Sequence, residues 1–183
     1  MLKLFFFLFS FLISINEGRI ELFSIASSKE KVIDEETVFR SVWKIEDKSS
    51  SGTGFFIGPR TLVTNFHVID DLSSLEEVRI VQEGNLRELR VKNLLSVSIK
   101  EDLALLETEE SVSYYLNLEK EELDLSEAFY VLAYPGGKFQ KINQTGDLTE
   151  NSFFSDNFYN FGASGSPVLD KNHSLVGITY MAH

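Results

Sequence analysis

Cysteine is absent from this chain of 183 residues. Without a thiol, the protein can form no disulfide bond, no thiolate nucleophile, no cysteine-linked lipid anchor and no zinc cluster with sulfur ligands. Histidine is scarce as well, with three residues in the whole chain, so few imidazoles are available for acid–base chemistry or metal binding. We therefore predict no cofactor and no metal centre.

Basic residues are also few, because 17 Lys and Arg stand against 28 Asp and Glu, which gives a formal net charge of -11. Nucleic-acid binding needs a basic surface that neutralises phosphates, and this composition argues against one. We predict no nucleic-acid partner. Apolar residues make up 43% of the chain, enough for one sizeable domain or for two small halves that share a core.

The N-terminus, "MLKLFFFLFSFLISINEG", carries Lys3 and then an apolar run of 12 residues from Leu4 to Ile15. Such a run is too short to span a bilayer as a helix, and it fits the hydrophobic region of a secretory signal. We expect residues 1–26 to be a signal peptide or N-terminal anchor, and the protein to be secreted or periplasmic. Membrane contact is expected only in the alternative case, in which the segment is retained as an anchor.

Beyond residue 37, short apolar runs alternate with turn signals, which is typical of β-strands. No long amphipathic helix interrupts them, so we predict an all-β fold with two antiparallel sheets or barrels. The halves are expected at 38–107 and 128–183, joined by an acidic, solvated connector at 108–127. The strands are expected near Phe39–Ile45, Gly54–Ile57, Thr61–Asn65, Val78–Gln82, Glu88–Val97, Leu103–Glu107, Ala128–Ala133, Lys141–Thr145, Leu148–Phe154, Phe158–Phe161, Pro167–Leu169 and Leu175–Tyr180.

Three polar residues stand where predicted strands meet loops. His67 lies in "TLVTNFHVID", Asp102 in "EDLALLE" and Ser164 in "GASGSPVL". Alone, each has an ordinary interpretation: a strand-end histidine, a strand-edge charge and a turn serine. Together, in the order His, Asp, Ser, they provide a nucleophile, a base for its proton and a carboxylate that fixes the imidazole tautomer.

Other residues of the same types are weaker candidates. The remaining histidines lie in the "LDKNHSL" turn and at the last position, so His67 is the best base. Asp70 and Asp71 are so close to it in sequence that they would share its loop, which favours Asp102 as the third member.

The glycines around Ser164 give the serine its setting. Gly162 can adopt backbone angles barred to other residues, so that its N–H and that of Ser164 point into one pocket and stabilise a developing oxyanion. Ser166 is a rival nucleophile, but it directly precedes proline and lacks a glycine on each side. An α/β-hydrolase elbow would need glycine at that position, which disfavours that fold.

These motifs resemble those of trypsin-like (chymotrypsin-fold) bacterial serine peptidases, closest to the glutamyl endopeptidase and HtrA-like branches. The resemblance covers about residues 38–180 and rests on "SGTGFFIGPRTLVTNFHVI", "EDLALL", "LAYPGG" and "GASGSPVLDKNHSLVGI". It implies two antiparallel six-stranded barrels and a serine endopeptidase that cleaves polypeptides through an acyl-enzyme. The implied triad is His67, Asp102 and Ser164, with the Gly162 and Ser164 amides as oxyanion hole. A catalytically silent protease-fold binding module is the alternative.

The sequence departs from the family pattern near the implied substrate pocket. Ala163 replaces the usual polar residue before the nucleophile, and Thr179 stands where the glutamyl branch has a histidine, so a preference for glutamate is not expected. Phe158 and Tyr159 fall where family members carry pocket-floor residues. With Thr179 they predict an uncharged pocket that prefers an apolar or small residue, unless the loop aligns so that Asp156 forms the floor.

Ser164 is followed by 19 residues. They suffice for one hairpin, so the second barrel is expected to lack its last strand and the C-terminal helix of the family. The strand at Leu175–Tyr180 would then expose an unpaired edge, unless residues before Phe39 supply the missing strand.

Overall fold

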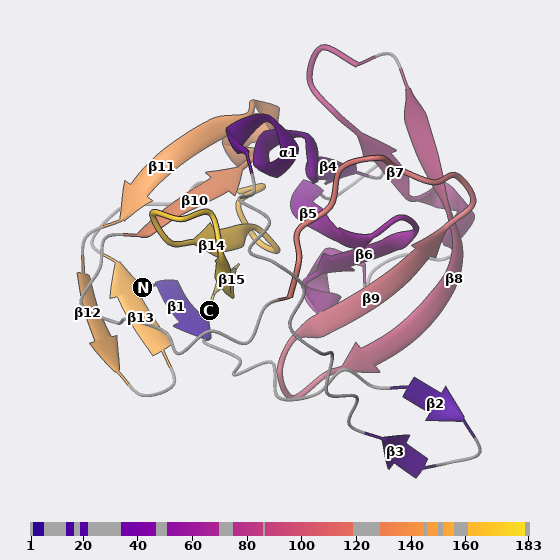
Figure 1. The fold of residues 1–183 in the computed structure, drawn as a ribbon, viewed down its shortest axis with the longest axis horizontal. Helices are drawn as coiled ribbons and strands as arrows, with labels where there is room; N and C mark the ends of the chain where they lie inside the picture. Colours follow the sequence, from indigo (N-terminus) through magenta and orange to yellow (C-terminus); the bar gives the residue numbers. More distant parts are fainter. Residues whose placement is uncertain are drawn as a thin grey trace.

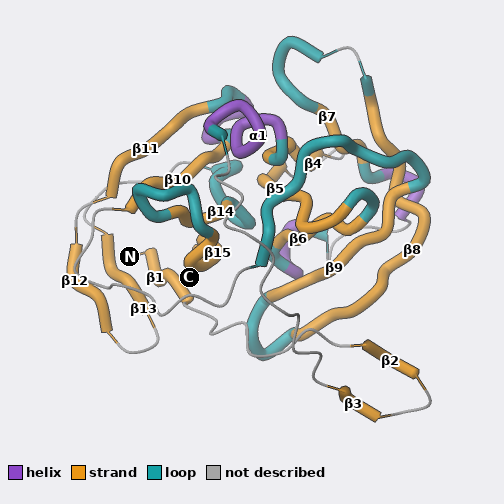
Figure 2. Tube along the Cα trace, viewed as in Figure 1, coloured by secondary structure: helices purple, strands orange, loops and turns teal. Residues whose placement is uncertain are grey.

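The computed structural model describes residues 2–5, 14–16, 19–21, 34–46, 51–69, 75–85, 87–118, 129–144, 146–149, 152–155 and 161–181. Figure 1 shows two β-rich units side by side, with the first on the right and the second on the left. Strands predominate among the described residues, and Figure 2 shows them in orange, with the described loops and turns in teal. The predicted all-β class is therefore confirmed.

The first unit is a closed barrel with the strand order β4-β5-β6-β9-β8-β7, and all of its neighbouring strands are antiparallel. Its interior is apolar, with side chains such as Ile45, Phe56 and Leu106 buried in one cluster. The strands are β4 (Val42–Glu46), β5 (Ser51–Gly58), β6 (Thr61–Thr64), β7 (Arg79–Val81), β8 (Glu88–Ser98) and β9 (Leu103–Thr108).

The second unit is a seven-stranded antiparallel sheet with the order β11-β10-β14-β15-β1-β13-β12. The predicted second barrel is not confirmed, because these strands form a sheet that is not closed among the described residues. A separate two-stranded pair, β2 (Ser14–Asn16) and β3 (Arg19–Glu21), lies outside both units. The strands of the sheet are β1 (Leu2–Phe5), β10 (Phe129–Ala133), β11 (Gln140–Gln144), β12 (Gly146–Thr149), β13 (Ser152–Ser155), β14 (Pro167–Leu169) and β15 (Leu175–Met181).

The edge of β15 that was expected to be open is paired in the structure. Strand β1 runs antiparallel to β15, with Leu4 opposite Thr179, and on its other side it pairs with β13. The prediction of an unpaired edge is therefore wrong. The reason is that a segment from before Phe39 supplies the neighbouring strand, and this segment falls within the range expected to be a signal peptide or anchor.

One predicted strand of the second unit is corrected by the structure, and another falls mostly on residues that the structure does not describe. The single strand expected at Leu148–Phe154 is two strands, β12 and β13, which pair with each other through residues such as Leu148 and Phe153. The strand expected at Phe158–Phe161 falls on residues outside the described ones, apart from Phe161, which lies in a turn.

Both faces of strand β10 are buried, and one of them packs against the first barrel. Val131 packs in one cluster with Ala163, the residue before the candidate nucleophile. Leu132, on the opposite face, packs in a second cluster that includes Phe55 of the first barrel. Since successive side chains of a strand point to opposite faces, β10 connects the shared core to the loop that carries the serine.

A short helix, α1 (Glu35–Arg40), occupies the start of the strand that was predicted at Phe39–Ile45. Asp34 caps it, because its carboxylate accepts a hydrogen bond of 2.7 Å from the Thr37 amide. Two acidic residues in the first turn also suit the positive end of the helix dipole. The strand proper, β4, begins two residues after the helix.

The connector after β9 is less solvated than expected. Val112 and Leu116 are both buried. Their amides donate hydrogen bonds of 2.7 Å to the Pro59 carbonyl and 2.8 Å to the Phe56 carbonyl. The described part of the connector therefore packs along the first barrel, because its few apolar residues are spaced to reach the core.

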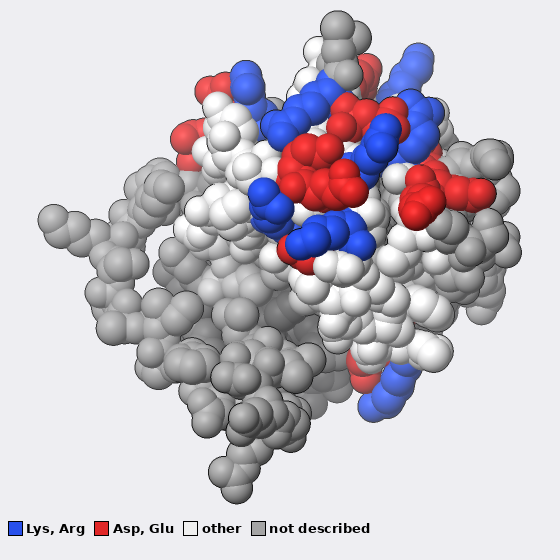
Figure 3. Space-filling view, turned by 90° about the vertical axis from the view of Figure 1, so that its right-hand side faces the viewer, with Lys and Arg blue, Asp and Glu red and all other residues white. Residues whose placement is uncertain are grey.

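Charged side chains of both signs are intermixed on the face shown in Figure 3. On the first barrel, Arg79 pairs with Glu88, and Lys92 pairs with Glu107. Both ion pairs join side chains of neighbouring strands. Within the described ranges, no helix has the length and apolar character needed to cross a membrane.

Candidate active site

His67 and Asp102 lie at the same end of two paired strands. His67 follows β6 in a short 3-10 helix, and Asp102 closes the turn that leads into β9. Because Thr64 is opposite Ala104 in the ladder, the residues just beyond that end of the pair meet. Asp102 has a positive φ of 50°, a conformation that aspartate tolerates better than most residues.

The Asp102 carboxylate contacts His67 twice. One oxygen, Oδ1, accepts a 2.9 Å hydrogen bond from the His67 amide, and Oδ2 lies 2.6 Å from His67 Nδ1. The Asp102 carbonyl also accepts from the Phe66 amide and from the Asn65 side-chain amide. The carboxylate thus fixes Nδ1 of the imidazole and leaves Nε2 on the other side of the ring.

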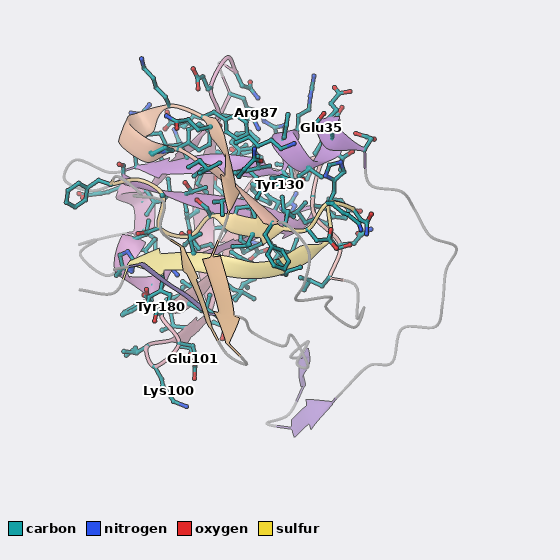
Figure 4. The ribbon with its side chains drawn as sticks, turned by 90° about the vertical axis from the view of Figure 1, so that its left-hand side faces the viewer. Glu35, Arg87, Lys100, Glu101, Tyr130 and Tyr180 are labelled. Carbon is teal, nitrogen blue, oxygen red and sulfur yellow. The ribbon has the colours of Figure 1, made fainter. Side chains whose placement is uncertain are left out.

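The end of β15 comes close to this pair. Burial, and secondarily the negative charge of Asp102, raise the pKa of Tyr180 above its usual value. Figure 4 shows Tyr180 on the same side of the molecule as Glu101, the neighbour of Asp102 in sequence. The end of β15 in the second unit therefore lies on the same side of the molecule as the turn between β8 and β9.

Ser164 lies between two glycines whose backbone conformations would be strained for other residues. Gly162 has φ of 101° and Gly165 has φ of 83°, both in the region that favours glycine. A Cβ atom on Gly162 would collide with the Tyr134 carbonyl, and one on Gly165 would collide with the Thr53 carbonyl. The glycines let the loop lie directly against the backbone of both units.

The peptide group between Phe161 and Gly162 is held in place by a hydrogen bond that its carbonyl accepts. Phe161 O accepts a 2.8 Å hydrogen bond from the Gly136 amide, which belongs to the "PGG" turn after β10. Because C=O and N–H point in opposite directions in a trans peptide, the Gly162 N–H points away from that turn. The Gly162 N–H donates to no backbone carbonyl within the described part of the chain.

The peptide group that carries the Ser164 amide is held in the same manner. Ala163 O accepts hydrogen bonds of 2.6 Å from the Thr179 hydroxyl and 2.6 Å from the Ser166 hydroxyl. The Ser164 N–H therefore points the opposite way, and it too donates to no backbone carbonyl among the described residues. Two amides are thus available for an oxygen that develops negative charge.

Strand β5 links the serine loop to the segment that carries His67. Thr53 donates its amide to the Ser164 carbonyl at 2.8 Å, and its own carbonyl accepts from the Thr64 hydroxyl at 2.8 Å. A Cβ atom on Gly165 would lie 3.1 Å from the Asn65 amide nitrogen. Ser164 is thereby placed beside the segment that carries His67.

The other residues considered in the sequence lie in different settings. Ser166 is fully buried, and its hydroxyl donates to Ala163 O. Thr179 is 1% exposed, and besides its donor bond its hydroxyl accepts from the Ser166 amide at 3.1 Å. His173 lies in the turn after β14, with Nδ1 2.5 Å from the Tyr130 hydroxyl oxygen. Outside the described residues lie Phe158, Tyr159, Asp156, Asp70, Asp71 and His183.

Sequence reasoning missed two residues that shape this site, Thr53 and Asn65. Both are fully buried polar residues. Thr53 stands between glycines in "SGTGFF", and a polar residue in a glycine-flanked apolar strand is a signal that it has a fixed partner. That partner lies 109 residues away in the sequence.

Solved structures of proteases share this fold at low sequence identity. Rv3671c of M. tuberculosis H37Rv, solved in an inactive form, has a TM-score of 0.62 and 22% identity, with 87% of this chain and 85% of that chain covered. A serine endoprotease from Yersinia pestis has a TM-score of 0.67 and 17% identity, covering 82% and 58%. A Glu endopeptidase has a TM-score of 0.59 and 21% identity, covering 76% and 78%.

A family model matches most of the region that forms the two units. The model describes a trypsin-like peptidase domain and matches residues 52–178. This range contains β5 from its second residue onward, both residues of the His67–Asp102 contact and the whole serine loop. The chain belongs to the trypsin-like peptidase domain family.

Proposed function

We propose that this protein is a serine endopeptidase in which Ser164 is the nucleophile, His67 the general base and Asp102 the residue that orients the imidazole. The observation that carries the proposal is the double contact of Asp102 with the amide and ring of His67. It supports a fixed tautomer, with Nε2 as the proton acceptor. The contact of the serine loop with the histidine segment supports Ser164 as the donor of that proton.

In the acylation step, Ser164 Oγ attacks the carbonyl carbon of the substrate while its proton passes to His67 Nε2. The electron pair of the carbonyl π bond moves to the carbonyl oxygen, which accepts hydrogen bonds from the Gly162 and Ser164 amides. Fixed donors of this kind each contribute roughly 2.7–4 kcal/mol where they have been removed by mutation. The ionised Asp102 stabilises the imidazolium that forms.

The tetrahedral intermediate then collapses. The bond between carbon and nitrogen breaks, the leaving amine takes the proton from His67, and the acyl group remains as an ester on Ser164. A water molecule next attacks the ester carbon and gives its proton to His67. Ser164 Oγ leaves with that proton, so that a carboxylic acid is released and the free enzyme is restored.

Ester hydrolysis tests the proposal directly. With a p-nitrophenyl ester, an acyl-enzyme that deacylates slowly gives a burst of nitrophenolate stoichiometric with the protein. Ser164→Ala should abolish the burst, whereas Ser166→Ala should keep a burst on a less stable protein. A burst that disappears in Ser166→Ala and persists in Ser164→Ala would overturn the assignment. The absence of both a burst and steady hydrolysis of the ester in the wild type would instead favour a silent protease-fold binding module.

We further propose that the substrate is a polypeptide cut after an apolar or small residue. The proposal rests on the sequence, which has Phe158 and Tyr159 and no acidic residue at these two positions, since a buried Arg or Lys without a partner would be costly. Cleavage of a peptide library would test it, and cuts made mainly after Arg or Lys would contradict it.

The apolar N-terminal run supports a proposal that the protein is exported from the cytoplasm. Fractionation of cells that produce the full chain would test this, with recovery outside the cytoplasm as the expected result. Recovery in the cytoplasm alone would contradict it.

A further inference from the structure

We infer that the hydroxyl of Thr53 is a positioning group for the candidate oxyanion hole and that it acts from the histidine-bearing barrel across to the serine loop. This inference rests on the proposed function. Thr53 lies on β5 and is fully buried. Its backbone and its side chain make separate contacts, and these have different consequences.

The backbone of Thr53 links the two halves of the site in any variant. Its amide donates to the Ser164 carbonyl, and its carbonyl accepts from the Thr64 hydroxyl, three residues before His67. These bonds set the distance between the serine loop and the end of β6. They do not depend on which side chain position 53 carries.

The side chain of Thr53 adds two hydrogen bonds to the second unit. Its Oγ1 donates to the Gly162 carbonyl at 2.6 Å and accepts from the Tyr134 amide at 3.0 Å. The hydroxyl thereby fixes the peptide group on the C-terminal side of Gly162. The Gly136 amide fixes the group on the N-terminal side.

Gly162 needs this double restraint because glycine can rotate freely about its own backbone bonds. With both flanking peptide groups held, its φ of 101° is maintained, and its N–H stays aimed at the oxyanion position. Without the Thr53 hydroxyl, the Gly162 carbonyl loses a donor and the Tyr134 amide loses an acceptor. No solvent reaches this buried position to replace the hydroxyl, so the loop is free to turn its N–H away.

Loss of the Thr53 hydroxyl should affect the transition state and not the binding of substrate. An oxyanion donor acts on charge that develops only as the tetrahedral intermediate forms, so its loss lowers kcat and leaves ground-state binding unchanged. Complete removal of one donor lowers kcat by about 10²–10³. A misaimed donor should cost less, about 10-fold to 100-fold.

The experiment compares Thr53→Val with Thr53→Ser and with a matched control, Thr108→Val. Thr108 is also fully buried in the first barrel, and its hydroxyl donates to the Glu110 carbonyl at 2.7 Å. All variants are assayed for kcat, KM and thermal midpoint. They are also titrated with a peptide aldehyde, which forms an oxyanion with the serine, and with the corresponding peptide alcohol, which forms none.

Thr53→Val should lower kcat and aldehyde affinity by about 10-fold to 100-fold, with KM and alcohol affinity changed by less than about twofold. Thr53→Ser should restore most of the loss, because it keeps the hydroxyl. Thr108→Val should lower the thermal midpoint only. If Thr53→Val does not fold, Thr53→Ala is measured in its place, with the same expectation.

Three results would overturn the inference. The first is a Thr53→Val protein whose kcat and aldehyde affinity match those of Thr108→Val, since Thr53 would then be a stabilising residue alone. The second is equal loss of aldehyde and alcohol affinity, which indicates general damage to the site. The third is a folded wild type that neither hydrolyses substrate nor binds the aldehyde. That result removes the proposed function as well, and the wild type alone reveals it.

Discussion

Asp102 is fastened to the segment that carries His67 through three of its oxygen atoms. Both carboxylate oxygens face His67, and the carbonyl oxygen accepts from Phe66 and Asn65. Most of these bonds involve backbone groups, so the aspartate holds its place whatever the protonation state of the imidazole. The pair is therefore held in place by the protein itself, which is what the proposed catalytic role of His67 requires.

Asp102→Asn should separate this positioning role from the electrostatic one. The amide oxygen can still accept from the His67 backbone, while an NH₂ group facing Nδ1 forces the imidazole into the wrong tautomer. We expect an unchanged thermal midpoint and a kcat lower by roughly 10⁴. Steady-state kinetics at neutral pH would measure it, and a loss below tenfold would show that Asp102 does not orient the base.

Gly165→Ala should abolish activity and destabilise the fold. A side chain at φ of 83° is strained, and its Cβ would collide with the Thr53 carbonyl and lie 2.5 Å from the Thr64 hydroxyl. Strain of this kind costs about 1–3 kcal/mol, before the steric clash is added. Gly58→Ala is the control, because a Cβ there lies no closer than 3.6 Å to its neighbours.

Thermal unfolding and ester hydrolysis would compare the two variants. Equal midpoints and equal rates for Gly165→Ala and Gly58→Ala would mean that the serine loop does not need the close approach to β5.

Some polar residues of the site could be predicted from the sequence, and others could not. His67, Asp102 and Ser164 could be singled out because each stands where an apolar run meets turn residues. The contact of Thr53 with the serine loop could not be predicted, because it is a hydrogen bond to a residue 109 positions away. The same holds for Thr179, which the sequence placed in a pocket and whose hydroxyl the structure shows bonded within the serine loop.

At the level of elements, the strands of the first barrel were predictable because apolar alternation is a local signal. Helix α1 was missed because only Val38 is buried among its six residues, too few to show a helical period. Its capping residue, Asp34, followed by two glutamates was the available signal. The pairing of β1 with β15 joins opposite ends of the chain, and no local pattern indicates the partner of a strand.

Removal of β1 should destabilise the second sheet. The strand pairs on both of its sides, so its loss leaves unpaired N–H and C=O groups on β13 and β15. We expect a chain without residues 1–5 to unfold at lower denaturant concentration and to aggregate more readily. Leu4→Pro, which removes a backbone donor, should act in the same direction, whereas Leu4→Val should not.

Denaturant unfolding with light scattering would measure both effects. Equal stability of the shortened and full chains would contradict a role for β1 in the sheet. Such a result would fit removal of the N-terminal segment as a signal peptide.

At the scale of the whole molecule, the two units share one core. Tyr130, Leu132 and Tyr134 of the second unit are buried in the same cluster as Phe55 and Val63 of the first. The catalytic proposal needs the two units to hold a fixed relation, since His67 belongs to one and Ser164 to the other. Burial of this shared apolar surface supplies the stabilisation that keeps them together.

This shared core should make the fold sensitive to alkali. Burial raises the pKa of Tyr134 from 10.0 to about 12, and burial also raises that of Tyr130. A raised pKa means that the folded state favours the neutral phenol, so the stability that Tyr134 contributes in this way is fully present below pH 10 and is lost as the pH rises through 12. Tyr134→Phe removes one of these titrations.

Denaturant unfolding at pH 9 and at pH 11 would test this. The wild type should lose more stability than Tyr134→Phe between the two values. Equal losses would show that the buried phenol does not couple to folding.

The central claim, that Ser164 is a nucleophile activated by His67, is tested most directly by fluorophosphonate labelling followed by mass spectrometry of the peptides. The account predicts one adduct in the wild type, on the peptide that contains Ser164, with its position at that residue. Ser164→Ala should give no adduct, and His67→Ala should be labelled far more slowly than the wild type. An adduct on Ser166, or wild-type labelling no faster than that of His67→Ala, would contradict it.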